Sequence, residues 1–366
     1  MKSLLFITLL YGSSVMANFD KKVEEIVIKY KIPSLSVMIL SHDKTILHSV
    51  YGVRKIGEND KVSKIDSFHL GSCAKAFTAT LILKLFEEGK LSLDDSITKY
   101  LSSLDKIKFQ EIKIKHLLSH TGGIAGNVEG APWAEMFSFD ITPSQGRELA
   151  IKYLNSAKVI GKPGVAFLYS NLGYMVLGQI IESIEKKSFE LVLSEKFFNP
   201  LGMKSCTFGP AGRTHNIPAP WAHHYENGKY TALDPKLIES DNPPAMSPAG
   251  GISCNQEDWA KFLSFVMNVG EHRAYLKPAT RAYISKTNLE EYTYGAWGKL
   301  HREWGGTLLT HSGSNTLNYS SVVLGLEKKF AFLINTNSPS AEAVLEVIPF
   351  LKDFYLNYED QAPSLR

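Results

Sequence analysis

Three short clusters carry side chains that could perform nucleophilic chemistry together. In chain order they are Ser72-Cys73-Ala74-Lys75, Tyr169-Ser170-Asn171 and His311-Ser312-Gly313. Each spelling recurs elsewhere in the chain, so no cluster is informative alone. One copy of each in this order suggests a serine that is activated by a lysine and a tyrosine rather than by a histidine–aspartate pair.

Ser72 and Lys75 are three residues apart, the spacing that places two side chains on one face of a helix. The segment after Ser72 is rich in helix formers, and Gly89 stands where a C-cap is expected. Ser72 would then lie at a helix start, where free N–H groups and the helix dipole favour developing negative charge. The alternative is that Ser72 only caps this helix. The other Ser-x-x-Lys copies lie in a turn, in an Asp/Ser-rich stretch or late in a helix, at Ser41, Ser96, Ser103 and Ser183.

Tyr169 and Asn171 follow a loop that contains Pro163-Gly164 and stand just ahead of a helical stretch. Side chains in such a place can project into a cleft. A nearby lysine ammonium would favour the phenolate form of Tyr169. The phenolate could take the serine proton and later hand it to the leaving group. The alternative is an ordinary half-buried tyrosine.

His311-Ser312-Gly313-Ser314 directly precedes a predicted pair of strands. Its glycine would let a substrate lie against the strand edge, and the following amide could donate to an oxyanion. A second His-x-Gly begins at His120, but it ends a helix and has no strand behind it. We therefore prefer His311.

Strand-like segments occur near both ends of the chain, and helical segments occupy its middle. The predicted fold is α+β, with an antiparallel sheet built from both chain ends, flanked by helices and carrying an all-helical insertion. We predict one catalytic domain over 18–366, its α/β part at about 18–70 and 248–366 and its helical part at about 71–247. The expected strands are 34–40, 45–53, 318–326 and 329–335, and the best helices 20–30, 72–88, 113–120, 145–154, 172–186 and 341–355.

The first seventeen residues have the pattern of a signal peptide. Lys2 is followed by the apolar run 4–10, and Val15 and Ala17 fit the small-residue rule before a cleavage site. We expect removal of residues 1–17 and a periplasmic or secreted protein; the alternative is an uncleaved N-terminal anchor. No later segment of the sequence is long and apolar enough to be a membrane helix.

Composition excludes several other classes. The formal charge of +3 is small and the lysines are scattered among acids, which argues against nucleic-acid binding. His116 and His120 are four apart, but no third ligand is signalled, so no metal site and no cofactor are predicted. Three cysteines leave at least one unpaired, and an exported location would permit a Cys206–Cys254 bridge that spacing alone does not show.

The clusters and the segments around them resemble the serine β-lactamase-related superfamily. Its nearer members are the class C β-lactamases, the serine D-alanyl-D-alanine carboxypeptidases and related esterases and D-aminopeptidases. The resemblance covers residues 25–357 and includes the stretches His116–Gly123, Pro200–Met203 and Pro248–Ile252.

The resemblance implies that Ser72 is the acylated nucleophile and that Lys75 and Tyr169 share the general-base and general-acid work. Asn171 would bind the amide side chain of the substrate. The backbone amides of Ser72 and Ser314 would form the oxyanion hole.

His311, with Ser312 and Gly313, would form the third substrate-binding motif. Class C β-lactamases usually have lysine at the first position, so histidine here resembles the carboxypeptidase and esterase side of the family. A histidine that titrates near neutrality holds a substrate carboxylate less dependably than a lysine does. Ser314-Asn315 also replaces a more open, glycine-rich continuation.

A literal Ser240-Asp241-Asn242 spells a motif of class A β-lactamases. It is followed by Pro243-Pro244 and by no Lys-Thr-Gly, so we interpret it as a coincidence in a loop. Aromatic residues are further candidates for the cleft wall, with packing in the core as the alternative for each: Tyr225, Tyr292, Tyr294, Trp297 and Trp304.

The sequence therefore predicts an exported serine hydrolase that forms an acyl-enzyme on Ser72. Its substrate would be a β-lactam, a D-amino-acid peptide or a small ester, including one derived from the cell wall. The alternative is a non-catalytic, penicillin-binding-like sensor or binding protein with the same fold. The substrate, the deacylation rate and the oligomeric state are not predicted.

Overall fold

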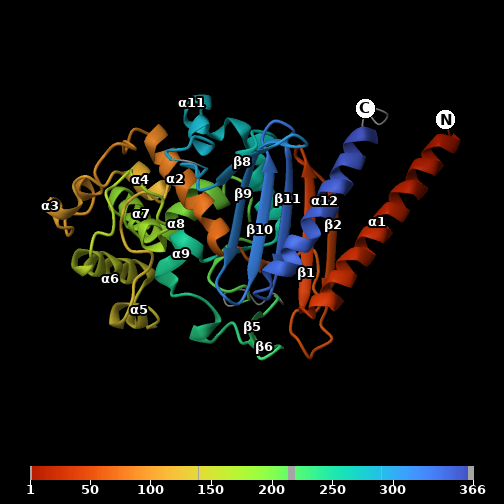
Figure 1. Ribbon diagram of the computed structural model, residues 1–366, viewed down its shortest axis with the longest axis horizontal. Coiled ribbons are helices and arrows are strands. Elements are labelled where there is room, and N and C mark those ends of the chain that lie inside the picture. Colours follow the sequence, from red (N-terminus) through yellow and green to blue (C-terminus); the bar gives the residue numbers. More distant parts are fainter. Residues whose placement is uncertain (1, 139, 213–218, 290, 362–366) are drawn as a thin grey trace.

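The computed structural model describes the backbone of residues 2–138, 140–212, 219–289 and 291–361, with side chains from residue 16 to residue 360 within these ranges. At its centre is a six-stranded antiparallel sheet of order β2-β1-β11-β10-β9-β8 (Figure 1). Two strands come from the N-terminal part of the chain and four from the C-terminal part. Their bounds are β1 Ser34–Ser41, β2 Lys44–Gly52, β8 Gly298–Arg302, β9 Gly306–Ser314, β10 Tyr319–Gly325 and β11 Phe330–Thr336.

Strand β1 shows how the sheet is held between two apolar layers. Leu35, Val37 and Ile39 pack in the cluster that contains the two terminal helices, whereas Met38 and Leu40 pack in the larger cluster on the other side. This alternation follows from the two-residue period of a strand. Because both faces are covered, every residue of β1 is buried. Each large apolar side chain buried in this way contributes about 1.5 to 3 kcal/mol.

Helices α1 (Lys2–Tyr30) and α12 (Ala341–Gln361) cover one face of the sheet, and the remaining helices lie on the other side (Figure 1). Helix α6 begins with a capping box between Thr142 and Gln145, and α7 begins with a Ser170 cap that accepts from the Gly173 amide. The other helices are α2 Lys75–Glu87, α3 Lys106–Phe109, α4 Ile114–Leu118, α5 Ala131–Glu135, α6 Pro143–Ser156, α7 Asn171–Glu185, α8 Phe189–Leu193, α9 Ser247–Gly250, α10 Gln256–Val266 and α11 Pro278–Arg281.

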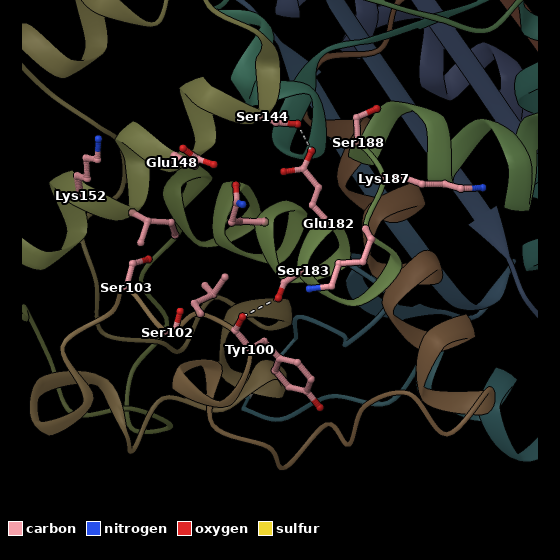
Figure 2. A pocket seen from close by; sticks show the side chains of 14 residues that line it. Tyr100, Ser102, Ser103, Ser144, Glu148, Lys152, Glu182, Ser183, Lys187 and Ser188 are labelled. Carbon is pink, nitrogen blue, oxygen red and sulfur yellow. Dashed lines mark hydrogen bonds between the residues drawn. The ribbon is translucent and has the colours of Figure 1, made fainter.

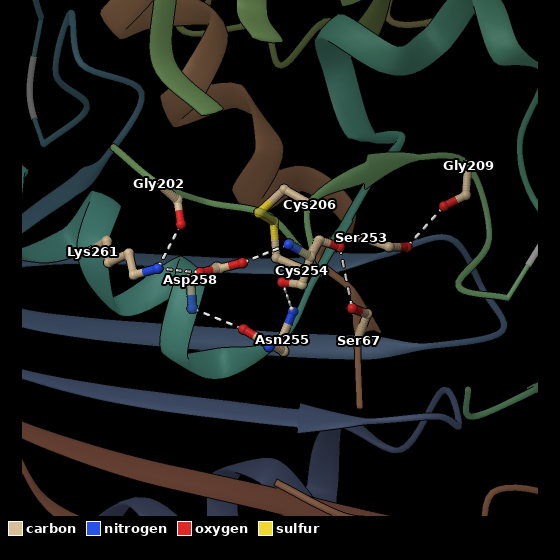
Figure 3. Close-up of a disulfide and its surroundings, with 10 residues drawn as sticks. Ser67, Gly202, Cys206, Gly209, Ser253, Cys254, Asn255, Asp258 and Lys261 are labelled. Carbon is tan, nitrogen blue, oxygen red and sulfur yellow. Dashed lines mark hydrogen bonds and ion pairs between the residues drawn. A yellow bond between two sulfur atoms is a disulfide. The ribbon is translucent and has the colours of Figure 1, made fainter. Parts of the chain in front are cut away.

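A small sheet of order β3-β7-β4 connects the helical part to the segment before Ser72. Cys206, just before β4, forms a disulfide with Cys254 of β7, and Figure 3 shows the bond lying between these segments. The Leu70 amide donates to the Ile252 carbonyl at 2.8 Å, so β7 also supports the turn that carries Ser72. The bounds are β3 Phe68–His69, β4 Thr207–Phe208 and β7 Ile252–Cys254, and a separate hairpin has β5 Ala222–Glu226 and β6 Lys229–Leu233.

The predicted α+β fold is confirmed. The part predicted as all-helical, 71–247, also contains the short strands β4, β5 and β6. Two further details differ from the prediction. Strands β8 and β9 were not predicted, because the serines, threonines and glycines of β9 hide its strand pattern. Helix α1 begins at Lys2 and so runs through the predicted signal peptide, whose cleavage stays a prediction. In the described part of the chain, no helix combines the length and the apolar character needed to cross a bilayer.

Reduction of the Cys206–Cys254 disulfide is expected to lower the free energy of unfolding by about 2 to 4 kcal/mol, because the bond closes a long loop. Its two cysteines are 48 residues apart in sequence. Urea unfolding with and without a thiol reductant measures the change. The Cys206→Ser/Cys254→Ser double variant is the control. Its free energy of unfolding should equal that of the reduced wild type and should not change when the reductant is added. Equal stability of the oxidised and fully reduced wild type would contradict the expectation.

Candidate active site

Ser72 and Lys75 meet at the start of α2, as their spacing predicts. Ser72 lies in the 3₁₀ turn Gly71–Ala74, and Lys75 is the first residue of the α-helix that continues it. Lys75 Nζ is 3.2 Å from Ser72 Oγ. The lysine is fully buried, and this burial lowers the pKa of its amine to about 7. A large fraction of Lys75 is therefore uncharged at neutral pH.

The amine of Lys75 has two further partners, both of which can only accept its protons. Asn171 Oδ1 lies at 2.7 Å and the Ala249 carbonyl oxygen at 2.6 Å. A neutral amine has two N–H groups and one lone pair. With its protons directed to these two acceptors, the lone pair is left for the hydroxyl of Ser72.

Tyr169 lies beside this pair, at the end of the loop before α7. Its ring centroid is 4.9 Å from Lys75 Nζ. The residue keeps 39% of its surface exposed, but burial of the hydroxyl end raises its pKa to about 12, against the opposing effect of Ser72 on that pKa. The expectation that Lys75 favours the phenolate is therefore corrected, because desolvation disfavours both charged forms.

Asn171 is the first residue of α7 and joins the lysine to the cleft. Its Oδ1 accepts from Lys75, and its Nδ2 donates to Asn127 Oδ1 at 2.8 Å. Both polar atoms of the amide thus have partners within the protein. Binding of a substrate amide by Asn171 stays a prediction.

His311 directly precedes the predicted pair β10 and β11, and it lies itself within β9, a strand that was not predicted. Its Nδ1 is 2.7 Å from the Ser312 carbonyl, which can only accept, so Nδ1 carries the proton. Nε2 is then free to accept from the hydroxyl of Tyr292 at 3.1 Å. Burial, followed by the charge of Lys75, lowers the pKa of His311 to about 4. The imidazole is therefore neutral at physiological pH.

The backbone around Ser72 packs directly against the end of β9. A Cβ added to Gly71, whose φ is +52°, would lie 2.4 Å from the Ser314 amide nitrogen. A Cβ added to Gly313 would lie 2.6 Å from the Ser72 amide nitrogen. Only glycine permits this approach. It brings together the two amides that were predicted to form the oxyanion hole.

Part of this site opens onto a cleft of about 330 Å³, whose described wall does not include Lys75, Tyr169 or His311. Its wall includes Ser72, Asn171 and Ser314 from the predicted site. It also includes residues that were not predicted as site residues: Asn127, Val128, Trp133, Asn242, Met246, Ala249, Gly250, Asn315 and Thr316. The nearest signal was the Ser240-Asp241-Asn242 spelling. Asn242 lines the same cleft as Ser72, so the loop with this spelling contributes to the cleft wall.

A larger hollow of about 560 Å³ lies elsewhere, in the helical part between α6 and α7 and the segment 100–103. Figure 2 shows its lining, which includes Ser103, Glu148 and Glu182 and no residue of the three clusters. The chemistry described above therefore belongs to the smaller cleft.

His120 was rejected as a third-motif residue, but the structure places it behind Tyr169. Its buried ring packs on the Tyr169 ring with centroids 4.1 Å apart. Its Nδ1 accepts from the Ser170 amide at 3.1 Å, and burial lowers its pKa well below the usual range. His120 thus supports the loop that carries Tyr169. The His120-Thr121-Gly122 sequence therefore lies next to the site, but His120 packs behind Tyr169 and does not occupy the third motif.

The chain is similar to known proteins in sequence and in fold. The sequence profile of the Beta-lactamase family matches residues 19–351. The chain is 26% identical over 352 residues to protein flp of Staphylococcus aureus strain MW2, which covers 93% of this chain and 67% of that protein.

Two solved structures are similar in fold. One is the octameric penicillin-binding protein homologue from Pyrococcus abyssi, with a TM-score of 0.75 and 24% identity over 92% of this chain and 77% of that one. The other is EstCE1, a hydrolase with promiscuous acyltransferase activity, with a TM-score of 0.73 and 19% identity over 88% and 94%. At these identities the likeness shows the fold.

The tautomer of His311 can be tested by nuclear magnetic resonance. We expect ring ¹⁵N shifts of a neutral imidazole with its proton on Nδ1, unchanged between pH 8 and about pH 5, because burial disfavours the charged form. The pKa of about 4 places protonation below this range. His311→Gln assigns the signal. A His311 titration with a midpoint near 6.5 would contradict the described environment.

Proposed function

The chain belongs to the Beta-lactamase family, a family of serine hydrolase-type enzymes. We propose that it is an exported enzyme that forms an acyl-enzyme on Ser72 with amide or ester substrates. The observation that carries the proposal is the buried Lys75 amine, whose pKa is about 7 and whose lone pair is left for the Ser72 hydroxyl. A general base poised near the working pH is the most effective one.

In the proposed acylation step, Ser72 Oγ bonds to the substrate carbonyl carbon while its proton passes to Lys75. The carbonyl oxygen becomes negative and receives hydrogen bonds from the amides of Ser72 and Ser314. The bond to the leaving group then breaks. Tyr169, kept protonated by its pKa of about 12, donates its proton to the leaving atom. Protonated Lys75 then returns a proton to Tyr169. Neutral enzyme and acylated serine result.

Deacylation uses the same groups in reverse. A water molecule loses a proton to Lys75 and adds to the ester carbonyl, and the oxyanion again meets the two amides. Collapse releases the carboxylic acid, and the proton returns to Ser72 Oγ. The role proposed for Asn171 is to keep Lys75 oriented, since its Oδ1 holds one amine proton away from Ser72.

Export to an oxidising compartment is part of the proposal. The predicted signal peptide supports it. The Cys206–Cys254 disulfide supports it as well, because disulfides persist in secreted and periplasmic proteins and are rare in the cytosol.

A fluorophosphonate should add one adduct to the wild type in intact-protein mass spectrometry and none to Ser72→Ala. The reason is that only an activated serine attacks the phosphorus. Ser103→Ala is the matched control, because Ser103 also begins a Ser-x-x-Lys spelling but lies outside the cleft. An adduct that persists in Ser72→Ala would show that Ser72 is not the nucleophile. A wild type without any adduct would favour the non-catalytic sensor.

The rate of this labelling should rise with pH and level off above about pH 7, because protonated Lys75 has no lone pair for the serine proton.

Lys75→Ala should label about 10²- to 10⁴-fold more slowly and lose the pH dependence. Lys84→Ala, on the same helix, should keep both rate and profile. Circular dichroism checks that each variant is folded. An unchanged rate in folded Lys75→Ala would show that another base acts.

A further inference from the structure

The cleft around Ser72 has an uncharged lining. All twelve described residues of its wall are neutral, and three of them besides Asn171 are asparagines: Asn127, Asn242 and Asn315. Asparagine side chains offer both donors and acceptors to amides and esters. A substrate carboxylate that enters such a cleft loses its hydration and gains no cationic partner from these residues.

Among the described residues of the three clusters, two could carry a positive charge near the cleft, and both are already engaged. Lys75 directs its amine to Ser72, Asn171 and Ala249, and it is fully buried. His311 has a partner at each ring nitrogen, and its Nδ1 proton faces the Ser312 carbonyl. With its proton on Nδ1, the ring offers Nε2 as an acceptor to the Tyr292 hydroxyl. The third motif therefore presents a neutral ring.

The wall beside Ser314 rests on an acidic residue. Buried Asp241 accepts from Asn315 Nδ2 at 2.8 Å and from the Asn242 amide at 2.7 Å through the same oxygen. Its other oxygen lies 3.0 Å from His69 Nε2. His69 accepts from the Gly71 amide through Nδ1, so its single proton is on Nε2 and the ring is neutral. Two hydrogen bonds to one oxygen hold Asp241 against this wall, and no lysine or arginine is among these contacts.

From this arrangement we infer that the enzyme selects acyl substrates without a carboxylate next to the scissile bond. Its substrate class is uncharged esters and amides, whose polar groups the asparagines can match. The negative charge of Asp241 behind Asn242 and Asn315 acts in the same direction, because it repels an anion at this wall. The inference rests on the proposed acylation of Ser72 and goes beyond it by naming the substrate class.

A pair of thioesters tests the inference. Both carry the same N-acetylglycyl acyl group, and their thiol leaving groups end in a carboxylate or in the corresponding carboxamide. Thiol release gives kcat/KM for each, divided by its rate with imidazole to remove differences in intrinsic reactivity. We expect the carboxylate to be at least about tenfold poorer. The same pair also competes with fluorophosphonate labelling of Ser72, which gives the ratio even where deacylation is slow.

A cation placed at the cleft mouth should reduce the discrimination. Thr316 is exposed and lines the cleft, so Thr316→Lys adds a charge with little effect on folding, and Thr316→Gln is its neutral control. We expect the ratio to fall at least about threefold in the lysine variant and not in the glutamine variant, with the effect reduced by salt.

The outcomes separate the two proposals. A carboxylate substrate that is used as well as the carboxamide, with Ser72 still labelled by the fluorophosphonate, overturns the selectivity and leaves the acyl-enzyme mechanism standing. Absence of labelling at Ser72 overturns both. A lower rate for the carboxylate that Thr316→Lys improves and Thr316→Gln does not supports the inference.

Discussion

The burial of the Lys75 amine is the constraint on which the rest of the site depends. Taking an amine out of water is costly unless its protons find acceptors. Here those acceptors come from α7, through Asn171, and from α9, through Ala249, while Ser72 comes from the same helical segment. Three segments far apart in sequence must therefore converge on one nitrogen. The fully buried apolar face of α2 holds them there.

The same desolvation acts on every titratable group of the site. It lowers the pKa of Lys75 and of His311 and raises that of Tyr169, so each group moves toward its neutral form. A neutral base, a protonated phenol and a neutral imidazole then coexist at physiological pH. The cleft wall beside these groups is also uncharged, and four of its residues are asparagines.

The backbone contact between Gly71 and Gly313 joins the two halves of the molecule. One glycine lies in the turn before α2 and the other near the end of β9. Strand β9 is placed by β10, which is placed in turn by β11 and, through it, by β1 from the N-terminal part of the chain. The position of one amide therefore depends on the whole sheet. Asp241 strengthens the contact, because it links His69 on one side to Asn315 on the other.

The sequence alone determined the features that depend on neighbours along the chain. The spacing of Ser72 and Lys75 on one helix, the helix that follows Tyr169, the first hairpin and the α+β class are all indicated by local patterns in the sequence. Tertiary structure decided the strand that carries His311, the pairing of Cys206 with Cys254 and the place of Asn242 in the cleft. It also decided the charge states of Lys75, Tyr169 and His311, because desolvation comes from residues that only folding brings around them.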